Sequence, residues 1–234
     1  MTLPKLSVPE YELTLPIKNT RVKYRPFLVR EEKLLYLAME SQDEKEMVNA
    51  VKTIIKSCTN LKAKVEELAT FEIEYLFLKI RSKAVGEYSE FMVTCPDDNE
   101  TKVEIKVPLE EIDLQVPEGH SNKIQIDDKV GVVMKYPSID VFISNNLKDN
   151  PKMDDIFELA ATCIENVYDD EQVYDSFTKK EAIEFIESMD SEQFQLIQKF
   201  FETMPKLSYT LKVTNPNTEV ESEIVLEGLA AFFG

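Results

Sequence analysis

The spacing of apolar residues changes several times along this chain of 234 residues. At the start, Tyr11, Leu13 and Leu15 alternate with polar residues, which is the period of a half-buried strand. From Glu31 the apolar residues recur at helical steps of three and four, and the period returns to two after Gly86. Because strands and helices occupy separate stretches, we expect an α+β fold in which β-hairpins with mostly antiparallel strands alternate with small helical blocks.

These changes in the spacing of apolar residues divide the chain into four segments. We expect residues 1–86 to form a hairpin and three helices, and residues 87–150 to form a central β-hairpin region. Residues 151–204 have the spacing of an acidic helical subdomain. Residues 205–234 are expected to form a C-terminal β-hairpin and an apolar tail.

Capping residues indicate where several helices begin. Asp43 precedes the second expected helix and Thr178 precedes a later one. A helix that begins near Met153 is expected to include Val167, because apolar residues continue at helical steps. The first helix is expected to place four apolar residues on one side: Leu34, Leu35, Leu37 and Ala38.

The charge of the chain is strongly negative and unevenly distributed. The net charge is −17, yet residues 1–30 carry six Lys or Arg and two Glu. Residues 151–204 carry 14 acidic and four basic residues. Nucleic acids and anionic membranes are therefore not expected as partners, since binding them depends on Lys and Arg. The asymmetry suits docking onto an acidic neighbouring protein, although a solvated surface without a partner agrees equally well with the charge.

Motifs for catalysis or for cofactor binding are not found in the sequence. The single histidine, His120, lies in a loop-like segment and is expected to be a turn residue that bonds to backbone. The five glycines are scattered, so they do not form a phosphate-binding loop. We therefore expect no enzymatic activity, no cofactor and no small-molecule substrate.

The cysteines do not form a disulfide framework or a complete metal site. The chain has three cysteines, which lie far apart in the sequence: Cys58, Cys95 and Cys163. Because their number is odd and their spacing is wide, we expect reduced thiols. Cys95 lies at a predicted hairpin tip, where a zinc knuckle would begin, but Asp98 stands where a second Cys would be needed. The matching tip in the tail has Asn215 and no Cys, so we expect no bound zinc.

Neither a membrane span nor a secretion signal is predicted. The longest apolar runs are shorter than a bilayer requires, and the opening residues lack the order of a signal peptide. We expect the protein to stay in the cytosol in which it is made.

Two places are candidates for a partner interface. Tyr24, Arg25 and Phe27 cluster at a bend set by Pro26, and these residue types are enriched in binding hot spots. In the alternative interpretation, Tyr24 and Phe27 belong to the core and Arg25 pairs with a carboxylate. The second candidate is the apolar tail, which either docks into a neighbour or packs on its own hairpin, and it comprises Leu229, Phe232 and Phe233.

Four separated segments carry a family resemblance from about residue 8 to the end of the chain. They are residues 23–35 (KYRPFLVREEKLL), 75–83 (YLFLKIRSK), 118–124 (EGHSNKI) and 226–233 (LEGLAAFF). In this order they resemble the baseplate hub subunit family of T-even-like contractile-tail bacteriophages, and in particular its cyanophage-type relatives.

The resemblance implies a structural or assembly role without catalysis. The expected partners are other phage tail and baseplate hub proteins, with the chain itself as a further option. Such a protein works in the host cytoplasm during assembly and, if it is retained, lies in the virion baseplate. One alternative is a transient chaperone for hub proteins that is absent from the mature virion. An alternative of another class is an acidic inhibitor of a host enzyme that mimics nucleic acid.

Overall fold

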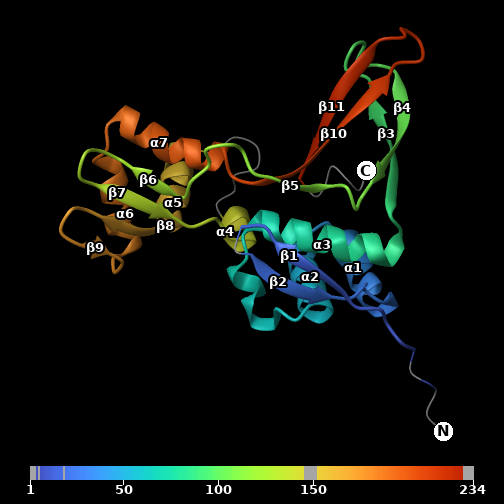
Figure 1. Ribbon diagram of the computed structural model, residues 1–234, viewed down its shortest axis with the longest axis horizontal. Coiled ribbons are helices and arrows are strands. Elements are labelled where there is room, and N and C mark those ends of the chain that lie inside the picture. Colours follow the sequence, from blue (N-terminus) through green and yellow to red (C-terminus); the bar gives the residue numbers. More distant parts are fainter. Residues whose placement is uncertain (1–3, 5, 18, 145–151, 229–234) are drawn as a thin grey trace. The chain divides into compact units, whose positions relative to one another are not determined.

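The computed structural model describes residues 4, 6–17, 19–144 and 152–228 of the chain. Its helices and antiparallel strands confirm the expected α+β fold (Figure 1). The chain divides into two compact units, the first made of residues 1–67, 71–115 and 206–234 and the second of residues 68–70 and 116–205. Segments from both halves of the sequence thus belong to the first unit, and the four-segment division stays a prediction about the order along the chain.

The first unit combines a hairpin, helices and two further strand groups. Its helical elements are α1 (Val29–Ser41), α2 (Glu44–Cys58), the short 3-10 helix η1 (Lys62–Glu67) and α3 (Thr70–Val85), whose first residue is assigned to the second unit. Its strands are β1 (Tyr11–Leu15), β2 (Thr20–Tyr24), β3 (Tyr88–Thr94), β4 (Lys102–Pro108), β5 (Asp113–Gln115), β10 (Lys206–Thr214) and β11 (Glu221–Glu227).

The second unit packs helices against a small antiparallel sheet. The sheet has the order β6-β7-β8-β9, formed by β6 (Lys123–Gln125), β7 (Gly131–Met134), β8 (Ile164–Tyr168) and β9 (Val173–Tyr174). Its helices are α4 (Ile139–Ser144), α5 (Met153–Cys163), α6 (Lys179–Glu187) and α7 (Ser191–Glu202).

The first hairpin forms as its alternating pattern predicts. Tyr11 of β1 lies opposite Tyr24 of β2, and the apolar side chains of Leu15 and Val22 are buried. The turn between the strands contains Asn19 with a φ of 48°, a left-handed conformation that Asn tolerates better than most residues.

Helices α2 and α3 carry much of the apolar core of the first unit. Asp43 caps α2 by accepting a hydrogen bond from the backbone N–H of Lys45 at 2.7 Å. Helix α3 is buried on most of its sides, which explains its nearly continuous apolar sequence. Its Lys79 ammonium donates to the backbone carbonyls of Glu110 and Ile112, each at 2.8 Å, and so holds the chain between β4 and β5.

The predicted central and C-terminal hairpins are confirmed as β3–β4 and β10–β11. Strand β5 adds to the free edge of β10, with Leu114 opposite Leu207, which gives a three-stranded sheet. Both hairpin tips contain a residue with positive φ, Asn99 in one and Glu219 in the other. The two tips thus share a turn geometry.

In the second unit, one sequence-based expectation about secondary structure is wrong. Helix α5 ends at Cys163, and residues 164–167, which were expected to continue the helix, lie in β8. Val167 of β8 pairs with Val132 of β7, so the sheet decides the conformation of a segment whose spacing also fits a helix. The core between the sheet and the helices includes Val132, Met134, Leu159, Ala160, Cys163, Ile164, Ala182, Ile186, Ile197 and Phe200.

Candidate partner-binding surfaces

The segment that contains Tyr24, Arg25 and Phe27 connects β2 to α1. Tyr24 and Phe27 are each only 7% exposed, so both side chains belong to the core of the first unit. The Arg25 guanidinium lies 3.0 Å from the Glu31 carboxylate and also donates to the carbonyl of Ser57 at 3.1 Å. These placements match the alternative interpretation, and a role of the segment in binding stays a prediction.

Glu31 is the centre of this arrangement and fixes the start of α1. Its carboxylate accepts hydrogen bonds from Arg25, from Arg30 at 2.7 Å and from the backbone N–H of Leu28 at 2.8 Å. Burial alone would raise the pKa of Glu31, but these hydrogen bonds lower it to about 2. We call these four residues the Glu31 cluster, and it orients α1 relative to β2 and the end of α2.

Helix α1 presents an apolar stripe to solvent. Val29, Lys33, Tyr36 and Leu37 follow helical steps of four, three and one, and therefore share one face. The exposed fractions are 79% for Val29, 59% for Tyr36 and 53% for Leu37. The expectation that Leu37 lies on the inner side with Ala38 is wrong, because only Ala38 of this pair is buried. We call these four residues the α1 stripe.

The distribution of apolar residues in the sequence of α1 already indicated the exposed α1 stripe. Apolar residues occur on all sides of α1, whereas in α2 they are confined to one stripe. A surface helix in a monomer buries one face only, so a second apolar face points to a binding surface. The periodicity alone assigned Leu37 to the wrong side of the helix.

The apolar tail lies partly beyond what the structure describes. Leu229, Phe232 and Phe233 are outside the described residues. Leu226, which precedes them in β11, is 8% exposed and packs within the first unit. The docking of the tail into a neighbour stays a prediction.

The tips of the two later hairpins are joined by polar side chains, which we call the hairpin-tip clasp. The Asn215 amide donates to the carboxylates of Asp97 and Asp98, and the Thr218 hydroxyl donates to Asp97. Cys95 and Asn215 hold corresponding positions in the two tips, and each is only 1% exposed. Hydrogen bonds thus connect the tips at the place where ligands of a zinc knuckle would meet.

Within residues 4, 6–17, 19–144 and 152–228, no group of three or more His, Cys, Asp or Glu side chains is arranged to hold a metal ion. Over the same described ranges, no helix is both long and apolar enough to cross a bilayer.

His120 has a more specific environment than its loop-like sequence suggests. Its backbone N–H does bond to a carbonyl, that of Pro117, as expected for a turn. In addition, its ring lies 2.8 Å from the Tyr136 hydroxyl and 2.9 Å from the Thr203 hydroxyl, and stacks on Phe200. Burial lowers the pKa of His120, which favours the neutral ring. The side chain therefore ties this loop to α7 and to the end of β7.

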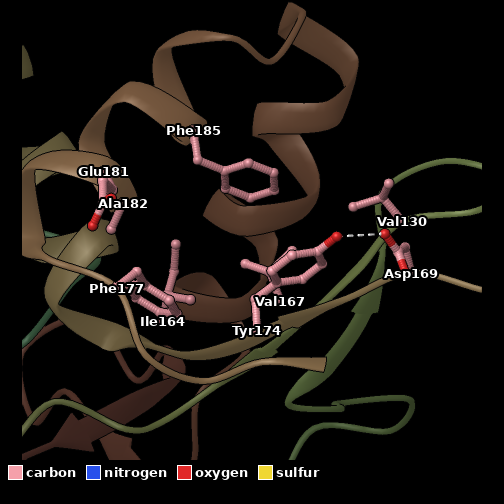
Figure 2. Close-up of a pocket in the computed structure, with 9 residues that line it drawn as sticks. All are labelled: Val130, Ile164, Val167, Asp169, Tyr174, Phe177, Glu181, Ala182 and Phe185. Atoms are coloured by element: carbon pink, nitrogen blue, oxygen red, sulfur yellow. Dashed lines mark hydrogen bonds between the residues drawn. The ribbon is translucent and has the colours of Figure 1, made fainter. Parts of the chain in front are cut away.

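An apolar pocket lies between the sheet and α6 of the second unit (Figure 2). Its volume is about 340 Å³, and the aromatic rings of Tyr174, Phe177 and Phe185 surround it. Two carboxylates lie at its edge, Asp169, which accepts a hydrogen bond from the Tyr174 hydroxyl at 2.9 Å, and Glu181. The lining is completed by Val130, Ile164, Val167 and Ala182.

The sequence around this pocket is strongly acidic. Residues 165–187 carry eight acidic and two basic side chains. An apolar cavity inside an acidic surface favours an apolar group presented on a basic segment.

Comparison with known proteins gives one match, and it extends over nearly the whole chain. A family model described as T4 bacteriophage base plate protein matches residues 8–234. No curated protein and no solved structure matches the chain.

Proposed function

The chain belongs to the family of T4 bacteriophage base plate proteins, and from this membership we propose that it acts at the base plate hub. In this proposal it is a structural or assembly protein that works by binding other tail proteins. The observation that carries the proposal is the match over residues 8–234, which includes both compact units.

The family is structural, which agrees with the expectation of a non-enzymatic chain. The α1 stripe supports a binding role, because exposed apolar side chains on a rigid helix are a common means of protein recognition. The Glu31 cluster supports it further by fixing the start of that helix. We propose the α1 stripe as the principal docking surface for a base plate protein.

A subunit of the hub and a transient chaperone both require such a surface, and they differ in their fate. A subunit remains in the finished particle, whereas a chaperone is released before the base plate is complete. We propose that this chain is a subunit that is assembled in the host cytoplasm and retained in the virion base plate.

The test is quantitative mass spectrometry of purified phage particles, with a known tail protein as the internal standard. A hub subunit is expected at a constant molar ratio to that standard after repeated purification. If the chain is abundant in lysates of infected cells but absent from particles, the chaperone role replaces the subunit role. A pull-down from infected cells that recovers a host enzyme instead of tail proteins would contradict both.

A further inference from the structure

We infer that His120 is a pH-sensitive latch of the second unit: its neutral ring fastens the loop that enters this unit to the end of the helix that leaves it, and a proton on the ring releases the loop. The inference goes beyond the proposed function, because it concerns a change of conformation within the chain and needs no partner.

The latch lies where the chain enters and leaves the second unit. Apart from residues 68–70, this unit is one stretch that begins at Val116 and ends at Pro205, shortly after α7. Every residue from Gln115 to Lys123 is exposed except His120, which is half-buried. Its ring lies 2.9 Å from the hydroxyl of Thr203, the residue that ends α7. His120 is therefore the side chain that anchors the first part of the entering loop.

The hydrogen bonds around the ring determine which nitrogen carries the hydrogen. The Thr203 hydroxyl donates to the backbone carbonyl of Lys199 at 2.7 Å, so it can only accept from Nδ1 of His120. Nδ1 therefore carries the hydrogen of the neutral ring, and Nε2 accepts from the Tyr136 hydroxyl at 2.8 Å. The three bonds run in one direction, from Tyr136 through the ring to the carbonyl of Lys199.

A proton on Nε2 disrupts this chain of bonds. Both nitrogens of a charged imidazole are donors, so the Tyr136 hydroxyl must turn and lose the bond that it donates. The surroundings also disfavour a charge, because the ring stacks on the aromatic rings of Tyr136 and Phe200. Burial lowers the pKa of His120 accordingly.

Charged residues on the surrounding elements do not offset the burial. Tyr136 is the titratable group in contact with the ring. The charged residues of the loop, of the segment after β7 and of the last turn of α7 are Glu118, Lys123, Lys135, Lys199 and Glu202. The lowered pKa of His120 has burial as its cause, so neither carboxylate of this set holds a charged ring in place.

The direction of the pH dependence follows from the two states of the loop. In the released loop the ring has its ordinary pKa of about 6.5, and in the latched loop its pKa is lower. Release therefore takes up a proton, and below about pH 6.5 it becomes more favourable by up to about tenfold per pH unit, until the pKa of the latched ring is reached. The chain has a single histidine and carboxyl groups ordinarily titrate near pH 4, so the range from about pH 7 to about pH 5 isolates His120.

Nitrogen NMR of the single histidine in the full chain tests the latched state. At neutral pH we expect the hydrogen on Nδ1, and we expect the ring to titrate below its ordinary pKa of about 6.5. A ring with its hydrogen on Nε2, or one that titrates like a free histidine, overturns the inference.

Hydrogen exchange measured by mass spectrometry tests the release of the loop. The backbone N–H groups of His120 and Thr203 are both hydrogen-bonded, and their exchange is compared with that of the unfolded chain at each pH. In the wild type their protection should fall between about pH 7 and about pH 5. In His120→Gln, whose side chain does not titrate, protection should be equal at both pH values. Constant protection in the wild type overturns the inference.

Two threonine variants separate the latch from an ordinary helix contact. Thr203→Val removes the acceptor for Nδ1 and should raise exchange at His120 about fivefold at neutral pH, as expected for the loss of one hydrogen bond. Thr162→Val is the matched control, because the Thr162 hydroxyl also donates to a carbonyl four residues earlier, that of Glu158, at 2.7 Å in α5. It should leave exchange at His120 unchanged, and equal effects of the two variants overturn the inference.

A further variant keeps the test decisive if Thr203→Val fails to fold by circular dichroism. Tyr136→Phe removes the donor to Nε2 and retains the aromatic ring, so the pKa of His120 measured by NMR should rise toward its ordinary value. An unchanged pKa in Tyr136→Phe overturns the inference.

Discussion

The Nδ2 atom of Asn215 lies 3.0 Å from each of the two carboxylate oxygens of Asp97, although the two residues are 118 positions apart in the sequence. The same amide lies 2.8 Å from a carboxylate oxygen of Asp98. Its carbonyl oxygen accepts the backbone N–H of Asn217 at 2.9 Å, which orients the amide toward the carboxylates. Hydrogen bonds of this clasp thus join two hairpin tips that lie far apart in the sequence.

Removing the amide should destabilise the first unit. Asn215→Ala is expected to lower the free energy of unfolding by about 2–3 kcal/mol, because a buried amide then no longer bonds to charged carboxylates. Chemical denaturation followed by circular dichroism measures the change. Asn217→Ala is the control, since Asn217 makes an exposed bond to Thr101, and it should cost less than about 1 kcal/mol. Equal losses of unfolding free energy for the two variants would contradict a central role for Asn215.

The clasp should also make the stability of the fold depend on pH. Hydrogen bonds from Thr218 and then from Asn215 lower the pKa of Asp97, and bonds from Thr101 and from backbone N–H groups lower the pKa of Asp98. Because the folded-state pKa values lie below the ordinary value of about 4, the stabilisation is present above that pH and is lost as pH falls through the lowered values. The melting temperature of the wild type should fall more steeply below about pH 4 than that of Asn215→Ala. Parallel curves would exclude this contribution.

The Glu31 cluster predicts a loss of stability when its carboxylate is neutralised. Glu31→Gln should lower the free energy of unfolding by about 2–3 kcal/mol, because the half-buried Arg25 then lacks its ion pair. Urea titration measures this loss, and Glu32→Gln at the next position of α1 should change stability by less than about 0.5 kcal/mol. If Glu31→Gln is as stable as the wild type, the cluster does not hold the start of α1.

The three cysteines should be unreactive in the folded chain. Burial raises the pKa of the Cys58 thiol to about 11 and that of Cys163 to about 12, and burial also raises the pKa of Cys95. Since the thiolate is the reacting form, iodoacetamide at about pH 8 should label none of them rapidly. Mass spectrometry should detect three labels only after unfolding. Labelling of a native thiol at the rate of the unfolded chain would contradict the burial.

Local features of the fold were predictable from the sequence because their causes are local. Thr178 was expected to begin a helix, and its hydroxyl oxygen accepts the backbone N–H of Glu181 at 3.2 Å. The hairpin tip expected at Cys95 is confirmed, and Asn99 in it has a positive φ, which Asn tolerates.

Features that depend on distant partners were not predictable in the same way. The spacing from Ile164 to Val167 fits either a helix or a strand, and pairing with β7 decides for the strand. The composition of the tips indicated two turns, but not that Asn215 bonds to Asp97. Likewise, the spacing in α1 placed Leu37 on the same side as Ala38, whereas the core covers only Ala38.

The most direct test of the central claim is complementation of a phage that lacks this gene, with complete base plates counted by electron microscopy of lysates. The wild-type chain and the control Val225→Glu, which changes a 54% exposed residue of β11, should restore base plates equally. Leu37→Glu, produced at the same level and folded, should restore few or none, because it places a charge in the α1 stripe. Normal numbers of base plates with Leu37→Glu would contradict the claim that this chain acts through that surface.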